Sequence, residues 1–113
     1  MKRHKEKRPW GKFERFTLNE KSSVKIISVN AGKRLSLQYH KKRKEFWRVL
    51  SGKGRVTIGN KILNAKKGDE FIVKTRQKHR IEALGEGIVI LEISFGKFDE
   101  NDIVRLEDDF GRI

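Results

Sequence analysis

A chain of 113 residues is long enough for one domain with a single hydrophobic core, and 28 lysines and arginines against 15 acidic residues give it a formal net charge of +13. That charge attracts phosphate groups, whether in nucleic acid, at a membrane surface or on a phosphorylated small molecule. The lack of cysteine excludes disulfides and thiolate metal ligands, and no apolar segment approaches the roughly 20 residues of a membrane span, so we expect a cytoplasmic location.

The charge is distributed unevenly along the chain. Residues 1–15 hold seven basic and two acidic side chains, whereas residues 99–112 hold six acidic and two basic ones. Opposite charges at the two ends can pair within the fold or across a dimer. The alternative is a solvated, lysine-rich surface of the kind seen in heat-stable proteins. We expect a single domain over residues 1–113, with a basic N-terminal arm at 1–15 and an acidic C-terminal segment at 99–113.

The centre of the chain alternates between short β-rich runs and turns. Period-two or continuous β-branched runs occupy residues 23–29, 34–40, 45–50, 55–59, 61–65, 70–74, 79–84 and 87–95. Glycine-rich and polar stretches separate these runs, and Gly59-Asn60 is typical of a two-residue hairpin turn. No three-turn stripe at helical spacing is present. The sequence therefore predicts an all-β protein, an antiparallel barrel or sandwich.

The two ends of the chain are less regular than its centre. Aromatic rings bury a large apolar area, so a few of them can hold an irregular segment in place. We expect these segments to be fastened to the outside or the rim of the barrel by four such rings: Trp10, Phe13, Phe16 and Phe98.

Three possible metal ligands stand close together in the sequence. Residues two apart share a face of an extended strand, so Gln38 and His40 are neighbours. Glu45 lies an odd number of residues further along, so the basic turn at 41–44 must bulge to bring it back to that face. The following strand would then run antiparallel to the first and place Glu45 near His40.

A fourth possible ligand, His79, occupies a similar position in the second half of the chain. A strand ends at residue 74, a polar turn follows at 75–78, and His79 begins the returning strand. If the two hairpins face each other inside a barrel, an amide oxygen, two imidazoles and a carboxylate converge on a set that suits a divalent metal. The alternative is that His40 is a core histidine bonded to a backbone carbonyl and that Glu45 pairs with a lysine.

These residues resemble the motifs of a known superfamily, the cupins. Five residues resemble the first cupin motif in type and spacing: Gly32, Gln38, His40, Glu45 and Gly52. Gln38 stands where the motif has its first histidine, and Gly68 and His79 resemble the second motif. The chain is more closely similar to the C-terminal domain of type II mannose-6-phosphate isomerases. Three strings carry that likeness: RPWG at 8–11, LSLQYH at 35–40 and DIVRLEDDFGR at 102–112.

The resemblance implies a small antiparallel cupin barrel, which is jelly-roll-like and is also described as a double-stranded β-helix. It implies a homodimeric, metal-dependent isomerase of GDP-mannose biosynthesis that interconverts mannose 6-phosphate and fructose 6-phosphate. The divalent ion, for example Zn, Mn or Co, would be held by Gln38, His40, Glu45 and His79. Arg43 would have a catalytic or phosphate-steering role, since a guanidinium group suits phosphate.

The sequence leaves the catalytic base open, and Glu92 is one candidate for it. This residue interrupts the apolar run 87–95, and a carboxylate on a buried strand must be paired or have a raised pKa. The alternative is a structural ion pair with Arg105 or Arg112.

Other functions and partners are also considered. A non-catalytic, metal-binding cupin that binds a sugar phosphate or sugar nucleotide is the first alternative. Nucleic-acid binding through the basic arm and the turn at 41–44 is the second, and no recognition motif supports it. The chain lacks a glycine-rich nucleotide loop, so guanylyltransferase activity is not expected, and a separate guanylyltransferase chain is a candidate partner. The expected partners are therefore a sugar phosphate and a second copy of the chain, without a membrane.

Overall fold

A computed structural model describes the whole chain, residues 1–113, and the expected all-β class is confirmed. None of its elements is a helix that could cross a membrane. The nine strands are His4–Arg8 (β1), Gly11–Arg15 (β2), Ser22–Val29 (β3), Leu37–Tyr39 (β4), Lys44–Ile58 (β5), Lys61–Lys66 (β6), Glu70–Val73 (β7), His79–Phe95 (β8) and Val104–Glu107 (β9).

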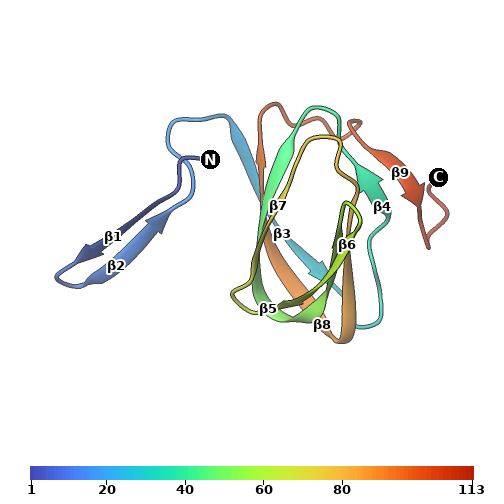
Figure 1. The fold of residues 1–113 in the computed structure, drawn as a ribbon, viewed down its shortest axis with the longest axis horizontal. Helices are drawn as coiled ribbons and strands as arrows, with labels where there is room; N and C mark the ends of the chain where they lie inside the picture. Colours follow the sequence, from blue (N-terminus) through green and yellow to red (C-terminus); the bar gives the residue numbers. More distant parts are fainter.

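Two long strands, β5 and β8, bend around the barrel and connect its walls (Figure 1). The first half of β5 pairs with the second half of β8, and this pair is flanked by β7 on β5 and by β3 on β8. The second half of β5 pairs with the first half of β8, flanked by β6 on one side and by β4 and then β9 on the other. Every pair is antiparallel, so the antiparallel barrel is confirmed.

The bend in β5 depends on glycine. The register of the β5–β8 pair shifts between Val49 and Ser51 and again between Gly52 and Gly54. Gly52 has φ of 82°, and a Cβ atom placed on it would overlap the carbonyl oxygen of Gly87 in β8. A side chain at this position would therefore be strained by its own backbone and would also push the two central strands apart.

Some expected boundaries and pairings are wrong. The runs at 45–50 and 55–59 are one strand, and so are those at 79–84 and 87–95, because the glycines between them allow a bend instead of ending the strand. The expected pairing of 34–40 with 45–50 does not occur: β4 pairs with β8 and β9, since consecutive strands cross between the walls of the barrel. The Gly59-Asn60 turn is confirmed, joining Ile58 to Lys61.

Inward-facing apolar side chains fill the barrel up to the polar site described below, where the indole N–H of Trp47 donates to Glu45 at 3.0 Å. They form one apolar cluster, consisting of Val29, Trp47, Val49, Val56, Ala65, Val73, Ile81, Ala83, Ile88 and Ile90. A smaller cluster lies on the outer face of β5 and β8, where Phe16 packs against Phe46, Ile93 and Phe95. Phe16 is therefore a fastener, as expected.

The first two strands form a hairpin that pairs with no other strand and stands away from the barrel in Figure 1. Trp10 lies in the turn of this hairpin and is 73% exposed. It is not a fastener within the chain, so that expectation is wrong for Trp10.

Candidate metal centre

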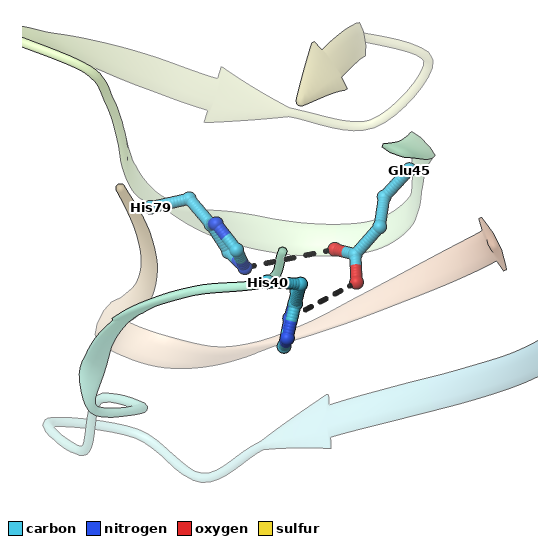
Figure 2. A group of neighbouring side chains, drawn as sticks. All are labelled: His40, Glu45 and His79. Carbon is cyan, nitrogen blue, oxygen red and sulfur yellow. Dashed lines mark ion pairs between the residues drawn. The ribbon is translucent and has the colours of Figure 1, made fainter. Parts of the chain in front are cut away.

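Three of the four predicted ligands lie together in the barrel interior. His40, Glu45 and His79 point toward one another (Figure 2), all three are buried, and their candidate ligand atoms lie within 4.8 Å of one another. The Nε2 atom of His40 is 3.3 Å from one carboxylate oxygen of Glu45, and Nε2 of His79 is 3.7 Å from the other. The predicted hairpins are absent, yet three elements still bring these side chains to one point.

The other nitrogen of each imidazole ring is bonded to the backbone. Nδ1 of His40 lies 2.6 Å from the carbonyl oxygen of Asp102, and Nδ1 of His79 lies 2.9 Å from that of Gln77. A carbonyl oxygen can only accept, so each Nδ1 carries a proton and Nε2 is the nitrogen that faces Glu45 and that would bind a cation. Two imidazole nitrogens and a carboxylate, oriented in this way, are a donor set that fits a divalent metal ion.

The loops that carry the histidines are bonded to each other and to the C-terminal segment. The side chain of Asp102 accepts hydrogen bonds from the backbone N–H groups of Lys41 and Lys42, at 2.8 and 3.0 Å. The backbone N–H of Arg76 donates to the carbonyl oxygen of His40 at 2.7 Å, and Arg76 has φ of 63°, in the left-handed region. These contacts fix the turn at 41–44 against the turn that precedes His79.

The fourth predicted ligand, Gln38, lies on β4 directly opposite His79 of β8 and lines the same cavity as the two histidines. This placement makes its amide available to the site. Its role as a ligand stays a prediction.

The protonation states of the cluster also suit a metal ion. Burial alone would raise the pKa of Glu45, but in the metal-free protein a hydrogen bond from His40 and the positive charge of His79, when these rings are protonated, hold that pKa below its ordinary value. Burial lowers the pKa of His79, which favours the neutral ring. An ionised carboxylate beside a neutral imidazole is the state in which both groups can bind a cation.

Arg43 lies beside the cluster and is buried, whereas its neighbours in the basic turn are exposed. Its Nε donates to Glu45 at 3.2 Å, and a second guanidinium nitrogen is 3.1 Å from Nε2 of His40. The guanidinium carbon also lies 4.5 Å from the ring centroid of Phe98. Arg43 therefore contacts two of the candidate ligands and holds the Glu45 carboxylate in place.

A cavity of about 350 Å³ opens in front of the cluster. The cavity is lined by the basic side chains of Lys25, Arg43 and Arg105, by the carboxyl groups of Glu92 and Glu100, and by Phe98. Phe98 is thus part of the cavity wall and not only a fastener. The mixture of cations with a candidate metal position makes this cavity suited to an anionic, oxygen-rich ligand.

Glu92 projects into this cavity from β8 and is buried. The ammonium group of Lys25 lies 3.4 Å from one oxygen of Glu92, and that oxygen has no hydrogen bond. The alternative of a structural ion pair is therefore correct in kind, but the partner is Lys25 and not Arg105 or Arg112. Burial, with a further contribution from the charge of Glu45, raises the pKa of Glu92 to about 7. This carboxyl group can therefore hold or release a proton near neutral pH.

The sequence patterns did not predict that Lys25, Asp102 and Arg105 belong to the site. They indicated Arg105 only as a possible partner of Glu92. Lys25 interrupts the β-branched run 23–29 at an inward-facing position, and a charge in such a run is a signal that could have been used. Arg105 reaches the cavity because β9 pairs with β4, and Asp102 just before β9 bonds to the loop that carries His40; no local pattern in the sequence predicts these long-range contacts.

The raised pKa of Glu92 predicts a pH effect on the stability of the metal-free protein. Glu92 loses its proton near pH 4.5 in the unfolded chain and near pH 7 in the folded protein. Between these two pH values the folded state therefore binds more protons than the unfolded state. The free energy of unfolding, relative to a Glu92→Gln variant, should therefore fall by on the order of 2 kcal/mol as pH rises through this window. Urea unfolding with a chelator at pH 5 and pH 8 measures this difference.

Glu86→Gln is the matched control, because Glu86 is on the same strand but exposed. Its stability relative to the parent protein should not change between the two pH values. A difference between the parent and Glu92→Gln that is equal at pH 5 and pH 8 would contradict the raised pKa.

Comparison with known protein families finds one family over nearly the whole chain. The family model described as mannose-6-phosphate isomerase C-terminal matches residues 1–108. The mannose-1-phosphate guanylyltransferase ManC of Salmonella typhimurium is 34% identical over 108 residues, which are 94% of this chain and 22% of that protein. The chain thus spans less than a quarter of the length of this curated relative.

Solved structures support the barrel architecture. A cupin protein from Bacteroides fragilis matches with a TM-score of 0.63 and 28% identity, covering 73% of this chain and 72% of that one. Bacillus subtilis oxalate decarboxylase, described with Mn(II) centres, matches with a TM-score of 0.69 and 26% identity over 77% of this chain and 24% of that one. The cupin barrel, or double-stranded β-helix, is therefore confirmed.

The expected function needs correction. The sequence likeness implied interconversion of mannose 6-phosphate and fructose 6-phosphate, but the relatives are named mannose-1-phosphate guanylyltransferase. These names overturn the isomerase interpretation of this chain. The short motif strings identify the family of a domain, whereas the names describe the activity of much longer proteins.

Proposed function

This chain belongs to the mannose-6-phosphate isomerase C-terminal family, a group of enzyme domains, and from that premise we propose that it binds a divalent metal ion and a phosphorylated sugar in one cavity. The observation that carries the proposal is the convergence of His40, Glu45 and His79 at a cavity lined by cations. In this proposal the domain acts in mannose-phosphate metabolism. The longer relatives are named for a guanylyltransferase activity in the same metabolism.

In the proposed complex the metal ion binds the sugar and the cations of the cavity wall bind the phosphate. A divalent ion, when bound, would act as a Lewis acid toward a hydroxyl or carbonyl oxygen of the sugar. His40, Glu45 and His79 would hold it, with Gln38 as the proposed fourth ligand. The donor set admits Zn, Mn or Co.

The phosphate would be bound by the cations of the cavity wall. Arg105 lines the cavity, forms no ion pair with any carboxylate, and has a buried Nε without a hydrogen-bond partner. Lys25 is half-exposed and has only Glu92 as an anionic neighbour. Arg105 is therefore available to a phosphate, whereas Lys25 is paired with Glu92 and Arg43 with Glu45.

The two residues considered for catalysis take different roles in this proposal. Arg43 is a positioning residue, because it contacts the ligand side chains Glu45 and His40. Glu92 is the group that holds a proton next to the bound sugar. A cytoplasmic location and docking to a guanylyltransferase chain stay predictions that accompany the proposal.

Calorimetric titration of the metal-loaded protein with mannose 1-phosphate, mannose 6-phosphate and unmodified mannose tests the proposal. We expect both phosphates to bind more tightly than mannose, and Arg105→Ala to weaken phosphate binding about tenfold or more, as loss of a hydrogen bond to a charged group does. Arg112→Ala is the control, because Arg112 pairs with Asp108 at the surface. Equal affinity for mannose and its phosphates, or no binding of any of the three, would refute the proposal.

A further inference from the structure

The segment 97–107 leads from β8 into β9 and forms one wall of the cavity at the candidate metal centre. Four of its residues line that cavity: Phe98, Glu100, Ile103 and Arg105. The last part of the segment is β9, which lies beside β4 at the edge of the barrel (Figure 1). The cavity is therefore complete only while this segment is docked against the barrel.

Little apolar contact holds the segment in place. No residue from 96 to 107 is buried, and none belongs to either apolar cluster. The pairing of β9 with β4 has three positions in register, with an irregularity between Leu37 and Gln38. Glu107 pairs with Arg80, but the Glu107 side chain is 60% exposed. Segments with few buried apolar contacts open at a low cost in free energy, so this one depends on its polar contacts with the barrel.

Asp102 makes polar contacts between this segment and the loop that follows His40. Its two carboxylate oxygens accept hydrogen bonds from the backbone N–H groups of Lys41 and Lys42, at 2.8 and 3.0 Å. Its carbonyl oxygen accepts a hydrogen bond from Nδ1 of His40 at 2.6 Å. One residue of the segment is therefore bonded both to the ring of His40 and to the backbone just beyond it.

The hydrogen bond at Nδ1 matters for an ion at Nε2. A partner at the second ring nitrogen fixes the orientation of a histidine ligand and makes the ligand a stronger donor. His79 obtains this partner from Gln77, two residues away, whereas His40 obtains it from Asp102, 62 residues away. The His40 side of the metal centre thus depends on a distant part of the chain.

The segment also contacts Arg43, which holds the Glu45 carboxylate. The carbonyl oxygen of Asp99 accepts a hydrogen bond from Arg43 at 3.5 Å, and the guanidinium carbon lies 4.5 Å from the ring centroid of Phe98. Two of the three clustered ligands, His40 and Glu45, are therefore connected to the segment directly or through one side chain.

We propose that Asp102 is a positioning residue of the metal centre, and that docking of the segment 97–107 and binding of a divalent ion stabilise each other. The inference rests on the metal site of the proposed function. Linkage is reciprocal, so an ion that binds the docked form about tenfold more tightly shifts the docking equilibrium by the same factor. Because Arg105 lies on this segment, the ion also stabilises the wall that carries the proposed phosphate-binding residue.

Competition titration with zinc tests the role of Asp102. We expect Asp102→Ala to weaken zinc binding about tenfold or more, and Asp102→Asn to weaken it less, because asparagine keeps one acceptor oxygen. Asp69→Ala is the matched control. Asp69 is also partly exposed and accepts a hydrogen bond from the backbone N–H of Lys66, but it lies in the turn between β6 and β7. Its substitution should leave zinc affinity unchanged, and urea unfolding establishes that each variant is folded.

Hydrogen exchange of the parent chain tests the reverse effect without any substitution. The N–H groups of Lys41 and Lys42 lose their acceptor when the segment leaves the barrel, and those of β9 that bond to β4 lose theirs. All of these groups should exchange about tenfold more slowly with zinc than with a chelator. The N–H of Asp69, bonded to the carbonyl of Lys66, should exchange equally in both conditions.

The possible failures of the inference and of the proposed function are distinct. Unchanged zinc affinity in Asp102→Ala, an equal loss in Asp69→Ala, or exchange at β9 that zinc does not slow would overturn the inference and leave the metal site in place. A parent chain that binds no zinc would overturn both.

Discussion

His40→Ala and His79→Ala are each expected to weaken binding of a divalent ion by more than about a hundredfold, since removal of even an indirect support of a metal ligand costs tenfold to a hundredfold. Each substitution removes one of only three clustered donors and leaves the Glu45 carboxylate with a single imidazole neighbour. Competition titration against a coloured chelator, with zinc and with manganese, measures the affinity.

The chain supplies its own control for this prediction. It has three histidines, and the third, His4, lies on β1 outside the barrel and is exposed. His4→Ala should leave the affinity unchanged. Equal loss of affinity in all three variants, or retained binding in His40→Ala and His79→Ala, would contradict the assigned site.

Gly52→Ala is expected to destabilise the barrel by more than about 3 kcal/mol, because strain and overpacking act at the same atom. A Cβ atom there would overlap the carbonyl of Gly87, where the two central strands pair. β5 carries Glu45 and β8 carries His79, so separation of these strands also disturbs the metal site. Urea unfolding gives the loss in the free energy of unfolding.

Gly32→Ala separates the two causes of that loss. Gly32 has φ of 73°, close to the 82° of Gly52, but no atom lies within 4 Å of the added Cβ. The Gly32→Ala substitution should therefore lower the free energy of unfolding only by the cost of the left-handed backbone conformation, about 1 kcal/mol. Equal costs for the two alanine variants would show that the close approach to Gly87 does not matter.

The sequence predicts the strands of this protein better than their partners. Alternating and β-branched runs indicate where β3, β6 and β7 lie, because the two-residue period of a strand is a local property. The joining of two predicted runs into β5, and of two more into β8, depends on contacts between distant residues such as Gly52 and Gly87. The hairpin at 4–15 was missed because its residues are mostly charged and its strands cover no core.

The candidate site was partly predictable for the same reason. The spacing of Gln38 and His40, and the turn that returns Glu45, are local features, and they indicated side chains that the fold does bring to one cavity. Lys25, Asp102 and Arg105 come from other parts of the chain and depend on the β3–β8 and β4–β9 pairings. The activity was wrongly predicted, because motif strings identify a domain family but not the chemistry of the longer proteins that contain it.

The central claim is that one ion binds between His40, Glu45 and His79, and anomalous diffraction from metal-loaded crystals tests it most directly. The account predicts a single strong peak about 2.0–2.3 Å from Nε2 of both histidines and from a carboxylate oxygen of Glu45. A peak located only at the protein surface, or bound by the carboxylates of the acidic segment with the three buried donors still paired to one another, would contradict it.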